Sequence, residues 1–526
     1  MTTSLRRMKS VHSAYERLAT IITLVRRSTQ KSGKLNNKPK SASIAATRPS
    51  VSFLLPDELL SYIILEYAFA MDVSSRKWAP ILLVCRRWHD VARARAQLWS
   101  YVSDLQSTER CLELIKRSGE YPPTCNFALP HSLFNLLNAG GHARRVRSLR
   151  IPDSFDEDVM QKMNDFSMLE ALHMSMLGQP DETVHLTLLD AFFDGRAPCL
   201  HRIALRGALS TIWTALSNLT VLSLAHYGHS HRLSFQNLLS ILQQSPRLRE
   251  LTLRSCLRAT DVRDALITLD MRSESLSLSH LERLDVSAGW CLTVEALLTC
   301  IVLPPTAFLY VRIYNAKPSG IEKLLLQVRQ HLRKPGSPVL RAINIGGGPH
   351  RTHRVLLSVS AGTTRIPDTS TSNPLTEESV RISLSPYRPY FRESIARALF
   401  TKILDALPLE HVADLVTLGA RSVQSRHTFS STTWGVVFCH IPRLETARSG
   451  FREGMAEVVK GLFDTVQRSA YGLGGKRRRR ASQGLNVRPF LTSQDWPTTD
   501  ALYDQLWGLL VVYREMGTSF KPAGVA

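Results

Sequence analysis

The feature that most constrains the fold of this chain is a recurring pattern of apolar residues. The spacing apolar-x-x-apolar-x-apolar occurs eight times between residues 146 and 345, and its middle positions lie 23, 31, 19, 29, 33, 27 and 32 residues apart. The alternation at the end of each pattern predicts a short strand with one buried face. Such a recurrence predicts similar units that stack, because each unit buries its apolar face only against its neighbours. The eight patterns are Val146/Leu149/Ile151, Leu169/Leu172/Met174, Leu200/Ile203/Leu205, Leu219/Leu222/Leu224, Leu248/Leu251/Leu253, Leu281/Leu284/Val286, Phe308/Val311/Ile313 and Leu340/Ile343/Ile345.

Stretches with helical periodicity lie between several of these strands, for example residues 235–242 before Pro246 and 294–301 before Pro304. A strand followed by a helix, repeated many times, predicts a curved solenoid with parallel strands on its concave face and helices outside. The repeats resemble the divergent leucine-rich repeats of large fungal F-box protein families. The asparagine or cysteine that usually follows the strand is mostly missing, and only Cys256 falls near such a place. Another α/β domain with leucine-rich strands remains the alternative.

A second informative stretch, residues 54–99, predicts three short helices. Proline suits the first helical position, so a helix is expected from Pro56, with Asp57 and Glu58 placed favourably in its first turn. A second helix is expected near Pro80 and covers residues 81–84. The third carries Cys85, Trp88, Val91 and Ala92 on one face. In the first helix, the spacing i, i+1, i+4, i+5 and i+8 predicts a wide apolar face made of Leu59, Leu60, Ile63, Ile64 and Tyr67.

Four sequence blocks in this stretch, 55–60, 63–65, 84–88 and 98–99, resemble the F-box in their order. In that family the module docks a Skp-type adaptor, which connects to a cullin and a ubiquitin-charged conjugating enzyme, while the rest of the chain selects the protein to be modified. A module of about 45 residues has a small core, so a partner that completes it is expected. The resemblance implies an adaptor-binding surface made of Leu55, Pro56, Leu59, Leu60, Ile63, Ile64, Val84, Cys85, Trp88, Leu98 and Trp99.

Two features leave this assignment open. Residues 70–79 replace the usual short connection, and Arg76, Lys77 and Trp78 within them are expected to be exposed. Trp88 and Trp99 are large apolar residues that serve equally well as ordinary core residues.

The positive charge of the chain is concentrated in two segments. The net charge is +22, of which residues 1–50 carry +10 and residues 476–480 carry +5, which leaves +7 for the other 471 residues. A fold that binds nucleic acid along its surface should be basic in its folded part, so a nucleic-acid partner is not expected. The second segment is a candidate nuclear-localisation signal or a solvated charge run. Its residues are Lys476, Arg477, Arg478, Arg479 and Arg480.

The N-terminal segment allows two interpretations. Arginines flank the apolar residues 18–25 with almost no acidic residue, which is typical of a mitochondrial transit peptide or of a short amphipathic helix before a linker. No apolar run reaches the roughly 18 residues that a membrane span needs. The expected location is therefore cytoplasmic and/or nuclear, without a membrane partner.

Motifs for chemistry are missing from the sequence. The eight cysteines form no Cys-x-x-Cys pair and predict reduced thiols, and the cluster of His226, His229 and His231 predicts a loop more than a metal site. Neither a phosphate-binding glycine loop nor a Gly-x-Ser-x-Gly motif is present. The chain is expected to be non-catalytic and to use no cofactor and no metal.

The sequence therefore predicts an α/β chain with a small three-helix F-box followed by a leucine-rich-repeat-like solenoid. The implied function is substrate recognition within a Skp–cullin–F-box ubiquitin ligase, with a protein target bound on the concave strands. The alternative is a nuclear nucleic-acid-associated or scaffolding solenoid without a role in ubiquitination. Candidate target contacts are the residues between the apolar strand positions, namely His173, Arg202, Ser223, Thr252 and Asp285. The expected domains are a basic segment (1–50), the F-box (51–102), a helical linker (103–140), the solenoid (141–465), a basic Gly/Arg-rich loop (466–498) and a terminal helix with a tail (499–526).

Overall fold

The computed structural model divides the chain into two compact units, Met1–Gly207 and Ala208–Ala526, and each is described by itself. Predictions on residues 1–50, on the histidine cluster, on the basic run 476–480 and on the terminal helix lie outside the described residues. The described residues are 55–71, 73, 77–102, 107–125, 137, 140–151, 166–176, 197–207, 217–225, 233–257, 275–316, 320–349, 355–363, 378–386, 393–419, 430–441, 443–444, 446–449, 461 and 486–487.

The first unit begins with a group of helices that we call the helical module. Its long helix starts immediately after Pro56 with Asp57 and Glu58 in the first turn, as predicted. The predicted second helix is present as a short 3-10 helix with Pro80 near its start. The module consists of α2 (Asp57–Ala70), η3 (Ala79–Leu83), α3 (Arg86–Ala94) and α4 (Ala96–Trp99).

The buried residues of α2 lie one position later than the predicted apolar face. The spacing is the expected one, but the face starts one position later, so Leu60 is fully buried whereas Leu59 is 53% exposed. One residue turns a helix by about 100°, which moves the whole apolar face. The small residue Ala68 takes the place predicted for Tyr67, and it is fully buried. The buried residues of α2 are Leu60, Ser61, Ile64, Leu65 and Ala68.

The segment before η3 contributes to the core of the helical module. Trp78, which was expected to be exposed, is only 3% exposed, so this prediction was wrong. Its indole N–H donates to the carbonyl of Val73 at 2.9 Å, and its ring meets the edge of Trp99 at 5.9 Å between centroids. Buried indoles usually have a partner for the N–H, and here the Val73 carbonyl is that partner.

The rest of the first unit is a series of parallel strands. Each strand pairs in parallel with the next strand along the chain from β1 to β5, with Leu149, Leu172 and Ile203 in register. The hydroxyl of Ser107 caps the helix that follows β1 by accepting from the Arg110 N–H. These elements are β1 (Tyr101–Val102), α5 (Thr108–Arg117), β2 (Thr124–Cys125), η4 (His142–Arg145), β3 (Ser148–Ile151), β4 (Ala171–Met176) and β5 (Arg202–Gly207).

The second unit contains a large, mostly parallel sheet. Its strands follow the order β6-β7-β9-β11-β14-β13-β12-β15-β16-β17, and a separate pair joins β8 to β10. The strands are β6 (Val221–Ala225), β7 (Glu250–Arg254), β8 (Leu276–Ser277), β9 (Arg283–Ala288), β10 (Ile301–Val302), β11 (Phe308–Ala316), β12 (Ala342–Pro349), β13 (Val355–Gly362), β14 (Glu378–Pro386), β15 (Asp414–Gly419), β16 (Thr446–Ser449) and β17 (Asn486–Val487).

All eight apolar patterns of the sequence contain a strand, from β3 at Leu149 to β12 at Ile343. The order of the last strands was not foreseen. Two strands separate β11 from β12, because β14 pairs in parallel with β11 and β13 runs antiparallel between β14 and β12. A hairpin excursion thus interrupts the simple progression from one repeat to the next.

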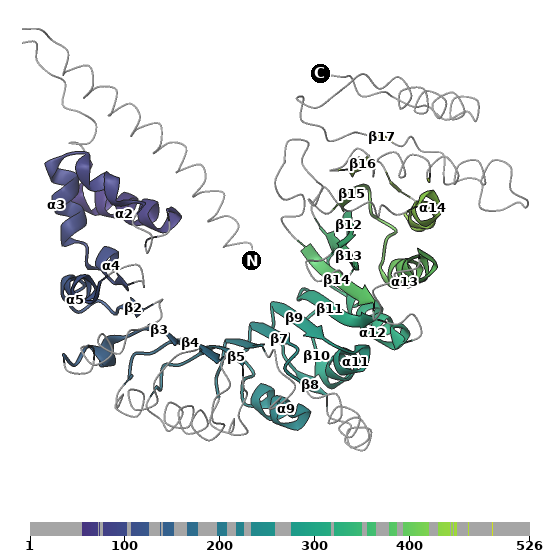
Figure 1. Cartoon of the computed structure of the whole chain (residues 1–526), viewed down its shortest axis with the longest axis horizontal. Helices are drawn as coiled ribbons and strands as arrows, with labels where there is room; N and C mark the ends of the chain where they lie inside the picture. The colour runs from purple at the N-terminus through teal and green to yellow at the C-terminus, as the bar shows by residue number, and fades with distance from the viewer. Residues whose placement is uncertain are drawn as a thin grey trace, which may run out of the picture. The chain divides into compact units, whose positions relative to one another are not determined.

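Helices cover one face of this sheet (Figure 1). They pack against one another in sequence order from α11 to α14, and α11 also contacts β9 and β11. Ser234 caps α9 through the Asn237 N–H at 3.1 Å, as expected for a serine before an apolar helix. The core lies between sheet and helices, where Leu284, Val311 and Phe400 are almost fully buried. The helices are α9 (Phe235–Gln243), α11 (Cys291–Cys300), α12 (Glu322–Leu332), α13 (Glu393–Ala406) and α14 (Ser431–His440).

Candidate functional site

The helical module carries an exposed apolar stripe on α2, which we call the α2 patch and define as Leu59, Tyr62 and Phe69. Their exposed fractions are 53%, 59% and 43%, and the spacing i, i+3, i+10 places them on one side of the helix. Leu83, at the end of η3, is a further large apolar residue that is 85% exposed. Leu59 and Tyr62 are neighbours at i and i+3, and large exposed apolar side chains grouped in this way are typical of a place where another protein binds.

The predicted adaptor-binding residues divide into a surface set and a core set. Pro56 and Leu59 are exposed, and a half-buried group adjoins them: Leu55, Ile63, Val84 and Cys85. The core set consists of Leu60, Ile64, Trp88, Leu98 and Trp99, all at most 6% exposed. A partner can therefore contact the surface set directly, whereas the core set supports the module from inside. Tyr62 and Phe69 were missed, although their i, i+3 and i+10 spacing from Leu59 is visible in the sequence.

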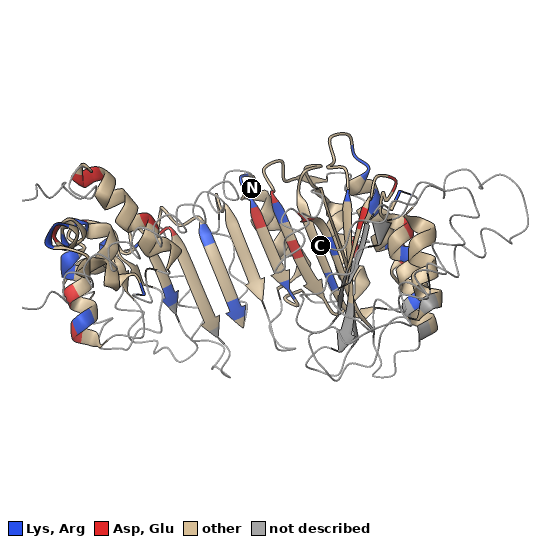
Figure 2. Ribbon diagram, turned by 90° about the horizontal axis from the view of Figure 1, so that it is seen from above, with Lys and Arg blue, Asp and Glu red and all other residues tan. Residues whose placement is uncertain are grey.

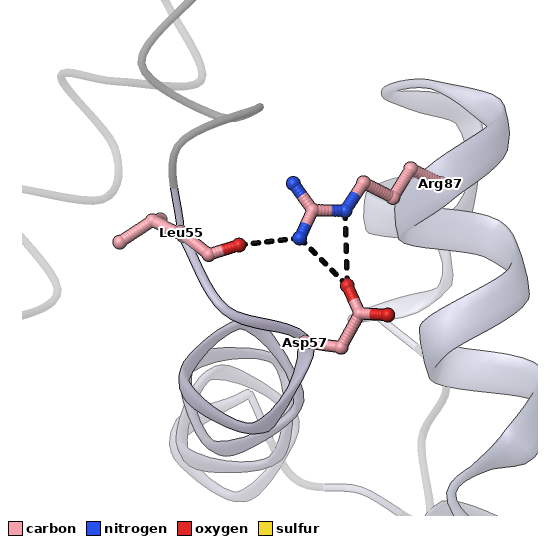
Figure 3. A network of polar contacts seen from close by, with 3 residues as sticks. All are labelled: Leu55, Asp57 and Arg87. Carbon is pink, nitrogen blue, oxygen red and sulfur yellow. Dashed lines mark hydrogen bonds and ion pairs between the residues drawn. The ribbon is translucent and has the colours of Figure 1, made fainter.

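A polar network joins the start of α2 to α3 (Figure 3). The Arg87 guanidinium donates to the Asp57 carboxylate from Nε at 2.9 Å and from the terminal nitrogen at 2.7 Å, and it also donates to the Leu55 carbonyl. Because a guanidinium is planar and rigid, several such bonds fix its orientation. The network thus holds the first turn of α2 against the Val-Cys-Arg-Arg-Trp block.

A cavity of about 250 Å³ adjoins the helical module. Trp78, Trp99 and Tyr101 line it, and the Arg117 guanidinium lies 5.2 Å from the Trp99 ring centroid. Arg117 also pairs with Glu113 at 2.7 Å. Burial raises the pKa of Tyr101, since the phenolate would lose its hydration in this environment. The phenol therefore stays neutral and packs as an apolar ring with a polar tip.

The second candidate surface is the face of the second unit's sheet that lies opposite the helices, which we call the open face. On β7, buried leucines alternate with the more exposed Glu250, Thr252 and Arg254, so these three residues point to the open face. Parallel pairing then places the open-face residues of three neighbouring strands in register. The rows are Glu250–Arg283–Phe308, Thr252–Asp285–Tyr310 and Arg254–Ser287–Arg312. Acidic and basic residues therefore occur together on these strands (Figure 2).

Arginine–aromatic contacts run across the open face. The Arg283 guanidinium lies 4.9 Å from the Phe308 ring centroid, and the guanidinium groups of Arg312 and Arg381 lie 5.4 and 5.6 Å from that of Tyr310. Register places Arg381 of β14 beside Tyr310. Arginine over an aromatic ring is a favourable contact and keeps the long side chain extended along the sheet.

Of the five target contacts suggested by the sequence, Asp285 alone is almost completely buried, at 2% exposed. It pairs with Arg254 at 2.9 Å, which is the compensation that a buried carboxylate requires. In the first unit His173 lies on β4 in register with Arg150, and its side chain is exposed. Partial desolvation on the sheet and then the charge of Arg150 lower its pKa. Arg202 is exposed, while Ser223 and Thr252 are half-buried.

Comparisons with known proteins do not assign a family: neither a scan against protein-family models nor a search of curated proteins found a match. Among the described residues, no helix is long and apolar enough to span a lipid bilayer. The same residues contain no group of three or more His, Cys, Asp or Glu side chains placed to hold a metal ion.

Proposed function

We propose that this chain is the substrate-recognition subunit of a Skp–cullin–F-box type ubiquitin ligase. In this proposal the helical module docks the adaptor, and the strands form a leucine-rich-repeat-like solenoid whose open face binds a protein target. The subunit has no catalytic step of its own. It acts by holding the target near the charged conjugating enzyme, which raises their effective concentration.

The observation that carries the proposal is the α2 patch on a module that matches the F-box blocks in order. An F-box must present apolar side chains to its adaptor, and Leu59 and Tyr62 are more than half exposed on the helix that the blocks define. The parallel strands that follow the module at repeat-like intervals support the second half of the proposal, since they provide a regular surface for a protein partner.

Binding of a purified Skp-type adaptor to the full chain tests the proposal. If each of two anchor side chains is worth about 2 kcal/mol, the double substitution Leu59→Ala plus Tyr62→Ala should weaken binding roughly a thousandfold. Both residues are exposed, so the module should remain folded. The matched control is Leu326→Ala on α12, because Leu326 is equally exposed at 51% but lies in the other unit.

The outcomes are distinct. No adaptor binding by the wild type would remove the proposed function, whereas equal weakening by the control would show that the α2 patch is not the contact. A chain that binds nucleic acid with a steep salt dependence and does not bind the adaptor would favour the nuclear alternative.

A further inference from the structure

Two buried donors without partners lie side by side on the open face of the second unit. Ser287 of β9 is 5% exposed and its hydroxyl makes no hydrogen bond, and the Nε of Arg312 on β11 is also buried and unpaired. The parallel pairing of β9 with β11 places Ser287 and Arg312 opposite each other, so they are neighbours on the open face. Buried donors nearly always have an acceptor, and two adjacent exceptions point to a ligand that accepts hydrogen bonds.

The charges around these donors favour an anion. Register places Arg254 on the other side of Ser287, so the hydroxyl lies between two arginine-bearing strands. Arg254 pairs with Asp285 and Arg381 pairs with Glu378, whereas Arg312 has no ion-pair partner among the described residues. The guanidinium of Arg312 is instead held over Tyr310. An uncompensated, half-buried cation beside a free hydroxyl is suited to one oxyanion.

We propose that Arg254, Ser287 and Arg312 form a binding site for a single oxyanion, a carboxylate or a phosphate monoester, on a segment of the protein target. The assignment of the anion to a protein target rests on the proposed function. A nucleic acid fits less well, because Glu250 and Asp285 lie on the same face, and Glu378 pairs with Arg381 of that face, so a chain of phosphates would be repelled. A single oxyanion next to Arg312 avoids most of that repulsion.

The ligand contacts follow from the donors available. The Arg312 guanidinium can give parallel N–H bonds to two oxygens of the anion, and the Ser287 hydroxyl can donate to one of them. Arg254 contributes charge from the neighbouring strand while it remains paired with Asp285. The half-buried ring of Tyr310 is apolar surface beside Arg312, on which a side chain flanking the anion in the target can pack.

The test uses the full chain and two small probes, inorganic phosphate and succinate, in calorimetric titrations. A few charge-assisted hydrogen bonds at a partly solvated site predict a dissociation constant on the order of 1 mM. Arg312→Gln should weaken binding of the preferred probe at least about tenfold, and Ser287→Ala should weaken it several-fold. The preference between the two probes distinguishes a phosphorylated target from one with a carboxylate.

Arg329→Gln on α12 is the matched control, because Arg329 is another half-buried arginine of the same unit on the helical side. It should leave probe binding unchanged, and thermal melting should show that all variants are folded. No probe binding, or binding that Arg312→Gln leaves unchanged, would overturn the site. An oligonucleotide whose binding depends on Arg312 would overturn the assignment to a protein segment. The adaptor is not in the assay, so failure of the proposed function is detected separately.

Discussion

Removal of the Trp78 side chain should open the helical module and leave the second unit intact. Trp78 is 3% exposed, donates to the Val73 carbonyl and contacts the edge of Trp99. Truncation of a buried tryptophan to alanine costs about 3 to 5 kcal/mol. A module of about 45 residues has a stability on the order of 2 to 7 kcal/mol. Trp78→Ala should therefore remove most of the free energy of unfolding of the helical module.

Hydrogen exchange followed by mass spectrometry resolves this effect, because it reports each segment separately. Amides of α2 and α3 should exchange roughly a hundred- to a thousandfold faster in the variant, while amides of β9 and β11 should be unchanged. Leu83→Ala is the control, since Leu83 is 85% exposed and its truncation should change stability by less than about 0.5 kcal/mol. Unchanged exchange in α2 after Trp78→Ala would refute the conclusion that Trp78 is part of the module's core.

Two further predictions concern buried titratable groups of the second unit. Burial raises the pKa of Cys300 to about 11, so at pH 8 only about one Cys300 thiol in a thousand is ionised. In the native protein a thiol reagent should therefore modify the exposed Cys439 much faster than Cys300. Denaturant should remove this difference in rate. Comparable rates for the two thiols in the native protein would contradict this. Burial lowers the pKa of His331 below its ordinary value, so the unfolded chain binds a proton more readily, and the stability that the neutral imidazole provides is lost as pH falls below about 6.5. The urea midpoint should thus decrease from pH 7.5 to pH 5.5 in the wild type and decrease less in His331→Gln, and an identical decrease in both would contradict this origin.

Most of the strands could be predicted from the sequence, because each depends on a local pattern. Leu222 and Leu224 alternate with half-buried residues on β6 as period-two spacing requires. The hairpin excursion of β13 and β14 could not be predicted, because local alternation does not show that β11 pairs with the distant β14 instead of β12. The spacing of the α2 face was visible, but which of its positions are buried depends on the elements that pack against it, and the structure buries Ala68 more completely than Tyr67.

The candidate sites show the same contrast between local patterns, which the sequence reveals, and contacts between distant residues, which it does not. The sequence indicated Leu59 on the α2 surface, whereas Trp78 was misjudged because a tryptophan among charged residues gives no sign of the Val73 carbonyl that accepts from it. The row of Arg254, Ser287 and Arg312 was not foreseen either. Its members are more than 20 residues apart, and only the strand register brings them together.

The most direct test of the proposed function is to map hydrogen exchange on the full chain with and without a Skp-type adaptor. The proposed function predicts slower exchange in α2, around Leu59 and Tyr62, and at the end of η3, with no change in β7, β9 and β11 of the open face. Protection confined to the open face, or no protection anywhere at saturating adaptor, would contradict it.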